Sequence, residues 1–211
     1  MADFPRPFRT PRPPVAAATR HSRHRRQPAR RLTIDADGYA SIALRAPTPN
    51  RDARPAGTDI SLVILHGISL PPGDFGGDDV LRLFANELDP AAHPYFATIA
   101  ELRVSAHFLI RRDGALVQFV SCAERAWHAG ESTWQGRARC NDFSIGIELE
   151  GTDDTPYTTP QYAMLGRLVR ALRRRYAIED VVGHSDVSPG RKTDPGPSFD
   201  WLRLRRALRR S

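Results

Sequence analysis

The chain has 211 residues and a formal net charge of +7, and this length suits one domain with a well-buried core. Most of the excess charge lies in residues 1–31, which carry nine arginines and one aspartate, whereas the rest of the chain carries 22 basic and 23 acidic side chains. A nearly neutral globular part argues against a domain built for nucleic-acid binding. Contact with nucleic acid or another anionic surface is left to the basic extension alone.

Residues 1–31 are rich in proline and arginine and show no apolar periodicity, so we expect a disordered extension followed by one globular domain over residues 32–211. The longest apolar run of the extension, Val15–Ala18, is far shorter than the ~7–15 residues of a secretory signal. No run of the chain is long enough to span a membrane. We therefore expect a cytoplasmic protein with no membrane partner. The oligomeric state is left open, with a monomer favoured.

The predicted strands, in chain order, are apolar runs bounded by turn residues: Ile60–Leu65, Ala106–Ile110, Leu116–Val120, Phe143–Leu149 and Asp180–Val182. Asp113-Gly114, between the second and third of them, predicts an antiparallel hairpin. Helical spacing of apolar residues predicts helices within Asp78–Leu88 and Pro160–Tyr176, the latter with Thr159 as N-cap. We expect a single α/β or α+β domain in which helices flank a mixed central sheet.

Two connecting segments, Pro71–Leu102 and Cys122–Asn141, are polar and interrupted by glycine and proline. Because such segments run over the surface and often carry function, we expect them to form the walls of a binding groove rather than core. Cys122 and Cys140 do not form a disulfide framework in a chain of this size, and we expect both to be free thiols without a catalytic role.

Three residues have the chemistry of a catalytic zinc site. His66 directly follows the apolar run "SLVIL", His184 follows "DVVG", and Asp194 lies in a proline-rich loop further along the chain. Two imidazoles and one carboxylate are a known zinc ligand set that leaves the fourth position open. The spacing alone also suits structural histidines at strand ends, so the pattern predicts zinc only when the three residues are considered together.

Hydrolytic zinc chemistry also requires a base and a positive charge. Period-two alternation in "FSIGIELEG" places Ser144, Gly146, Glu148 and Glu150 on one strand face. Burial on this otherwise apolar strand would raise the pKa of Glu148 toward the range of a general acid or base, with Gly146 leaving space for a substrate, whereas Glu150 borders a turn and suits a solvated face. Lys192 is the only lysine in the chain, and a compact ammonium beside a metal would stabilise a developing oxyanion.

Other residues are candidates for substrate contacts. Trp127 and His128, in "ERAWHAG", would offer an indole to stack on a sugar face and an imidazole to donate a hydrogen bond, although a loop tryptophan is about as often a core residue. Arg103 and Arg139 would hold substrate carboxylates. Since almost every basic residue of the chain is an arginine, neither stands out by residue type.

The sequence resembles the zinc-dependent N-acetylmuramyl-L-alanine amidases of the AmpD type, which are relatives of phage amidase lysozymes and peptidoglycan-recognition proteins. The resemblance is carried by "LHGISLPPGDFGG", "HPYFATIAELRVSAHFLIRRDG", "RAWHAGES", "CNDFSIGIELEGTDD" and "GHSDVSPGRKTDPGPSFDW", which cover nearly all of residues 60–202. It implies an amidase-like mixed fold whose zinc is held by His66, His184 and Asp194. One departure is Gly67, where the family usually has asparagine directly after the first zinc histidine.

The resemblance further implies that Glu148 activates the water, Lys192 supports the transition state, Arg103 and Arg139 contact the substrate, and Trp127 shapes the sugar side. The implied reaction is hydrolysis of the amide between the lactyl group of 1,6-anhydro-N-acetylmuramic acid and L-alanine in muropeptides from cell-wall turnover. Such recycling indirectly controls β-lactamase induction.

Three alternatives stay open: a non-catalytic peptidoglycan-binding module, an amidase acting on intact peptidoglycan, and a nucleic-acid-binding protein led by the basic extension. Retention of Glu148 and Lys192 beside a full zinc set counts against the first alternative.

Overall fold

The structure is a computed structural model that describes residues 31–209. Disorder was predicted for the basic extension, residues 1–31. All of these residues except Arg31 lie outside the described range, and the disorder stays a prediction. Among the described residues, no helix is both long and apolar enough to cross a membrane.

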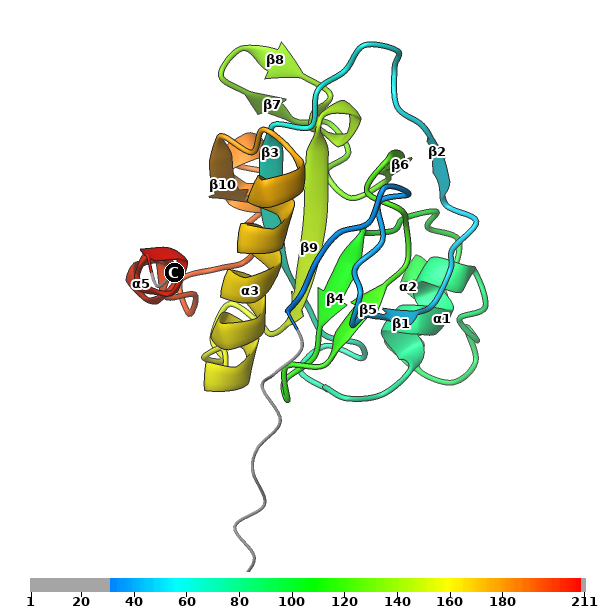
Figure 1. Ribbon diagram of the computed structural model, residues 1–211. Helices are drawn as coiled ribbons and strands as arrows, with labels where there is room; N and C mark the ends of the chain where they lie inside the picture. The colour runs from blue at the N-terminus through cyan, green and yellow to red at the C-terminus, as the bar shows by residue number, and fades with distance from the viewer. Residues whose placement is uncertain (1–30, 210–211) are drawn as a thin grey trace, which may run out of the picture. The chain divides into compact units, whose positions relative to one another are not determined.

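A mixed sheet of six strands forms the centre of the domain, in the order β1-β5-β4-β9-β3-β10 (Figure 1). Its strands are β1 Leu44–Arg45, β3 Leu62–Ile68, β4 Phe108–Ile110, β5 Leu116–Gln118, β9 Ser144–Glu150 and β10 Asp180–Gly183. β4, β9, β3 and β10 run parallel to one another, whereas β5 is antiparallel to β4. The expected mixed sheet is therefore confirmed, and all five predicted strands are present with ends shifted by up to three residues.

The largest shift occurs at the end of β3. The apolar run ends at Leu65, but the strand continues to Ile68 because His66, Gly67 and Ile68 stay paired with the last residues of β9. His66 is therefore a strand residue, held on a neighbouring backbone, rather than the first residue of a loop.

The predicted hairpin joins β4 to β5. Gly114 has a φ of +86°, and the Ala115 amide donates to the Asp113 carboxylate at 2.8 Å, as expected for a tight turn built on Asp-Gly. Two small antiparallel pairs escaped prediction: β2 (Arg51–Ala53) with β6 (Glu124–Ala126), and β7 (Thr133–Trp134) with β8 (Arg137–Ala138).

The long helix α3, Thr159–Arg175, confirms the helix predicted there, with a correction at its start. Thr158, not Thr159, is the N-cap: its side chain accepts from the Gln161 amide while the Gln161 side chain accepts from the Thr158 amide. Pro160 lies in the first turn, where its missing N–H costs nothing. The remaining helices are α1 Asp79–Ala85, α2 Pro94–Ile99, the 3-10 turn η1 Cys140–Asp142, α4 His184–Val187 and α5 Trp201–Arg209.

Helices cover both faces of the sheet. The apolar stripe of α3 is fully buried against one face, where it meets the inward residues of β3 and β9; it consists of Leu165, Leu168, Val169 and Leu172. α5 packs in turn against α3, and the Arg170 guanidinium donates to the Ala207 carbonyl (Figure 1). Each buried leucine or valine stabilises the fold by about 1.5–3 kcal/mol, so this stripe anchors the helix layer.

The other face is covered by α1 and α2, which belong to the segment Pro71–Leu102. The expectation that this segment contributes no core was wrong: Val80, Leu83, Phe84 and Phe96 are buried and pack against Leu109 and Val117 of the sheet. Their helical spacing allows a short, polar-looking segment to bury one apolar side.

Candidate active site

The predicted metal ligands emerge from neighbouring parallel strands. His66 lies on β3, and His184 directly follows β10 as the first residue of α4. The two strands pair with Gly183 opposite Leu65. The residue that follows each of these two positions in the chain is a histidine, so the two imidazoles lie side by side. Asp194 comes from the loop that follows α4.

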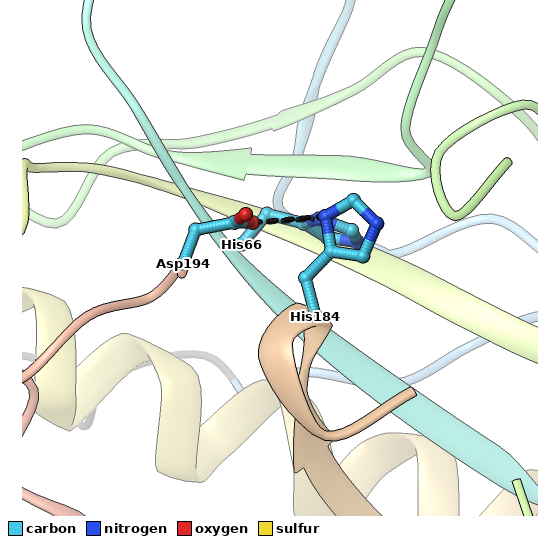
Figure 2. A group of neighbouring side chains, drawn as sticks. All are labelled: His66, His184 and Asp194. Atoms are coloured by element: carbon cyan, nitrogen blue, oxygen red, sulfur yellow. Dashed lines mark hydrogen bonds and ion pairs between the residues drawn. The ribbon is translucent and has the colours of Figure 1, made fainter. Parts of the chain in front are cut away.

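The three side chains converge on one point (Figure 2). His66 Nδ1 is 3.0 Å from His184 Nδ1, and Asp194 Oδ2 is 3.1 Å from each of these nitrogens. Both histidines are buried, and the Asp194 side chain is 20% exposed. Metal bonds of about 2.0–2.2 Å in a tetrahedral site place ligand atoms roughly 3.3 Å apart, close to the separations seen here. The three residues therefore form a possible metal-binding group.

Protonation states favour a cation at this point. Burial lowers the pKa of His66 to about 4, so its imidazole is neutral at pH 7. Burial works to raise the pKa of Asp194, but the adjoining imidazoles of His184 and His66 outweigh it and hold that pKa below its ordinary range. His184 Nε2 lies 3.2 Å from the Ala129 carbonyl and must carry the proton, which leaves a lone pair on Nδ1. A neutral imidazole, a free lone pair and a carboxylate together fit a divalent metal ion.

Glu148 lies directly across from His66 in the register of β3 and β9. Its side chain is buried, and Oε2 has no hydrogen-bond partner. Burial, reinforced by the negative charge of Asp194, raises the pKa of Glu148 well above its ordinary value, and Lys192 partly opposes this effect. An unpartnered buried carboxyl oxygen beside a metal group is a suitable position for exchanging a proton with a bound molecule.

Glu150, on the same face of β9, was expected to be solvated, and this is wrong. It is only 2% exposed, pairs with Arg111 at 3.3 Å and accepts from the amides of Gly76 and Arg112. Position beside a turn did not leave it in water because the segment before α1 folds over it. Two carboxylates of one strand therefore have opposite environments: Glu150 is fully paired and Glu148 is not.

A group of three hollows surrounds the metal group, with volumes of about 250, 380 and 200 Å³. Lys192 lines all three hollows. The 250 Å³ hollow contains all three metal-group side chains and Glu148, and its apolar wall comes from residues such as Leu83, Phe84 and Ile99. A larger cavity of about 540 Å³ between α3 and α5 contains none of these groups, so chemistry rather than volume locates the site.

The wall segments contribute as expected, with Tyr95 from Pro71–Leu102 and Trp127 and His128 from Cys122–Asn141 lining the hollows. Trp127 is half-buried, and its amide donates to Ser105 Oγ at 2.9 Å. Arg103 lies at the rim of the 200 Å³ hollow and is exposed.

Arg139 is not brought to these hollows. Its side chain is 71% exposed and pairs with Asp142 at 3.3 Å. Cys122 and Cys140 are free, as expected. Both are buried in core clusters, so the expectation that the segment Cys122–Asn141 contributes no core was wrong.

The space beside Gly146 is occupied, contrary to expectation. A Cβ atom on Gly146 would overlap the imidazole of His128, so the glycine makes room for that ring rather than for a substrate. His128 is 9% exposed, and burial lowers its pKa well below the ordinary value. Its nitrogens contact His66 and Ser144 inside the protein, so the expected hydrogen bond to a substrate is replaced by one to a metal-group histidine.

Two further positions line the site. Tyr95 was not predicted as a site residue. It lines two of the hollows and is 41% exposed. The sequence could have indicated it only as an aromatic residue within a predicted wall segment. Gly67 lines the same two hollows, and an added Cβ there would lie 2.5 Å from the Tyr157 hydroxyl, which itself donates to the Pro195 carbonyl. A larger residue at 67 therefore requires Tyr157 to move.

A buried, unpartnered carboxyl group beside a possible metal-binding group suits metal-assisted hydrolysis. Comparison with known proteins shows that the chain resembles amidases. Residues 56–197 match the family model described as N-acetylmuramoyl-L-alanine amidase. The 1,6-anhydro-N-acetylmuramyl-L-alanine amidase AmpD of Citrobacter freundii is 57% identical over 171 residues, 80% of this chain and 91% of the relative. AmpD of Escherichia coli K12 is 56% identical over 170 residues, 80% of this chain and 93% of the relative.

Solved structures give the same result. The crystal structure of a selenomethionine derivative of AmpD has a TM-score of 0.80 and 57% identity, covering 82% of this chain and 97% of the other. The Escherichia coli amidase AmiD, in complex with its substrate anhydro-N-acetylmuramic acid-L-Ala-D-gamma-Glu-L-Lys, has a TM-score of 0.52 and 28% identity, covering 84% of this chain and 65% of the other. The chain belongs to the N-acetylmuramoyl-L-alanine amidase family.

Proposed function

We propose that this protein hydrolyses the amide bond between the lactyl group of 1,6-anhydro-N-acetylmuramic acid and L-alanine in muropeptides. The observation that carries the proposal is Glu148, a buried and unpartnered carboxyl group directly across from His66 of the metal group. The names of the AmpD relatives, at 56–57% identity over most of both chains, support the anhydro-muropeptide as substrate.

Zinc is the metal that we propose for the site. Two imidazole nitrogens and one carboxylate oxygen are a known catalytic zinc ligand set, and His66, His184 and Asp194 supply them. When bound, zinc polarises the scissile carbonyl and lowers the pKa of water.

Glu148 takes the proton of the attacking water and returns one to the leaving amine of L-alanine. Its raised pKa suits this exchange because a carboxylate with a raised pKa is a stronger base toward the water proton, and the carboxyl group it becomes can then donate to the leaving amine. Lys192, at the junction of the three hollows, supplies a positive charge to the oxyanion of the tetrahedral intermediate.

The hollows around the metal group accommodate the rest of the substrate. We assign Trp127 to the sugar side, since its indole lines two hollows, and Arg103 to a substrate carboxylate at the rim. For Arg139 the exposed position beside Asp142 offers no support, and its substrate role rests on the resemblance alone. Cytoplasmic action, indirect control of β-lactamase induction and the monomeric state stay predictions.

A metal-content measurement tests the ligand assignment. His66→Ala, His184→Ala and Asp194→Ala should each bind less than one zinc ion per chain and lose activity on anhydro-muropeptide, because each removes one of three ligands. Asp59→Ala is the matched control, since Asp59 is exposed and lies outside the site. A triad variant that retained a full equivalent of zinc and wild-type activity would contradict the assignment.

A further inference from the structure

Each metal-group histidine has a second ring nitrogen, and both of these nitrogens are held by two consecutive residues of one loop. His66 Nε2 lies 3.0 Å from Nδ1 of His128, and His184 Nε2 lies 3.2 Å from the carbonyl oxygen of Ala129. The loop Ala126–Gly130 therefore contacts both imidazoles on the side away from Asp194.

We propose that His128 and Ala129, clamped by Asn141, are positioning residues that fix the tautomer and ring orientation of both metal-binding histidines. This inference rests on the proposed metal ligation. Outer hydrogen bonds of this kind orient ligand imidazoles and raise their basicity.

The direction of each hydrogen bond follows from ligation. When His66 binds metal through Nδ1, its proton is on Nε2 and is donated to His128 Nδ1. His128 then carries its own proton on Nε2, which donates to Ser144 Oγ at 3.2 Å. The Ala129 carbonyl requires a proton on His184 Nε2, which again leaves Nδ1 for the metal. All three rings therefore adopt the Nε2–H tautomer.

The position of the loop is itself fixed from two sides. The Asn141 side-chain oxygen accepts from the amides of both His128 and Ala129, at 3.2 and 2.8 Å. The Arg191 guanidinium donates to the same Ala129 carbonyl at 2.7 Å. Asn141 thus acts on the metal group through the two residues that contact it.

The sheet provides the space for this arrangement. Gly146 is the residue of β9 over which the His128 ring lies, and a Cβ atom there would overlap the ring. The Gly146 backbone amide donates to His107 Nδ1 at 3.0 Å, and this hydrogen bond fixes the position of β9 beneath the His128 ring. Ser144, two residues earlier on the same face, presents its hydroxyl to the far nitrogen of His128. The face of β9 that carries Glu148 therefore also carries the supports of His66.

Zinc affinity of the full chain separates a hydrogen-bonding role from simple space filling. His128→Phe keeps an aromatic ring but has no acceptor, whereas His128→Asn loses the ring and retains an oxygen near the position of Nδ1. We expect His128→Phe to weaken zinc binding about 10–100-fold, measured by competition with a chromogenic chelator, and His128→Asn to restore most of the affinity. If His128 only fills space, the order of the two variants is reversed, and that order would overturn the inference.

Asn141 is tested in the same assay. Asn141→Leu should weaken zinc binding in the same direction, and Asn141→Asp, which retains an acceptor for both amides, should weaken it less. Equal affinity in wild type and Asn141→Leu would remove Asn141 from the proposal.

A measurement on the unmodified chain keeps the inference testable when variants do not fold. Two-bond ¹H–¹⁵N correlation spectra of the zinc-loaded protein report the tautomer of each imidazole, and we expect the Nε2–H form for His66, His128 and His184. An Nδ1–H form of His128 would overturn the inference while leaving the zinc assignment intact. A chain that binds no zinc at all would overturn the proposed function and this inference together, so the two failures are distinguishable.

Discussion

Replacing Glu148 by glutamine removes one carboxyl group from the site and nearly preserves the shape of the side chain. Glu148 is buried, and Oε2 has no hydrogen-bond partner. Loss of a general acid/base group lowers the rate by about two to four orders of magnitude, equivalent to roughly 3–5 kcal/mol of activation free energy. The assay is release of peptide from an anhydro-muropeptide by Glu148→Gln loaded with one equivalent of zinc.

The same substitution should raise the stability of the metal-free protein, although it lowers the activity. In the metal-free protein the folded-state pKa of Glu148 lies above the unfolded value, so the folded state binds this proton more tightly and the contribution of Glu148 to wild-type stability falls as pH rises above about 4.5. Glutamine does not titrate. Metal-free Glu148→Gln should therefore unfold at higher urea concentration than wild type at pH 8, and the difference should shrink toward pH 4.

Glu150→Gln is the matched control because it alters the same face of the same strand. Glu150 accepts two backbone amides and pairs with Arg111, so this variant should lose stability and keep its turnover number. Near wild-type activity in Glu148→Gln, or a rate loss in Glu150→Gln as large as in Glu148→Gln, would refute the assignment of the acid/base group.

Three further predictions concern the lysine, the metal and the core. Lys192→Met should lower the turnover number about 100–1,000-fold with zinc content unchanged, and Lys192→Arg should recover only part of the loss because a planar guanidinium does not reproduce a compact ammonium; a full recovery by arginine would contradict the need for a lysine. Chelation should lower the thermal midpoint, since metal present at about 1,000 times its dissociation constant stabilises the fold by about 4 kcal/mol; an unchanged midpoint in calorimetry would show that metal and folding are not linked. Leu168→Ala should cost about 2–5 kcal/mol in urea unfolding, against less than about 0.5 kcal/mol for the 60% exposed Leu202→Ala, and a cost below 1 kcal/mol at Leu168 would contradict its place in the core.

The strands and the long helix could be predicted because their signals are local. Continuous apolar runs identified β3 and β9, Asp113-Gly114 identified the hairpin, and the stripe of α3 repeats at helical spacing. The strands β2, β6, β7 and β8 have only two or three residues each, and Ala126 is the one buried residue among them, so they carry no such pattern.

In the site, too, the residues with a local sequence signal were predicted, and those placed by distant contacts were not. His66, His184 and Asp194 were identified by residue type and position, and the parallel register that places Glu148 opposite His66 completes the arrangement. The position of His128 depends on its contacts with His66 and Gly146, which are 62 and 18 positions away in the chain. The residues next to His128 in the chain do not indicate that its side chain is buried. His128 was therefore expected to be accessible and to contact a substrate. Glu150 was misjudged for the same reason, since its partners come from other segments.

Mass spectrometry of the reaction products tests whether the chain is a zinc-dependent amidase of anhydro-muropeptides. Purified full-length protein is incubated with an anhydro-muropeptide as isolated, after chelation, and after chelation followed by added zinc. We expect release of 1,6-anhydro-N-acetylmuramic acid and free peptide, abolished by the chelator and restored by zinc. No cleavage by the zinc-loaded protein would contradict it and would favour a peptidoglycan-binding module, and cleavage that survives chelation would contradict the role of the metal.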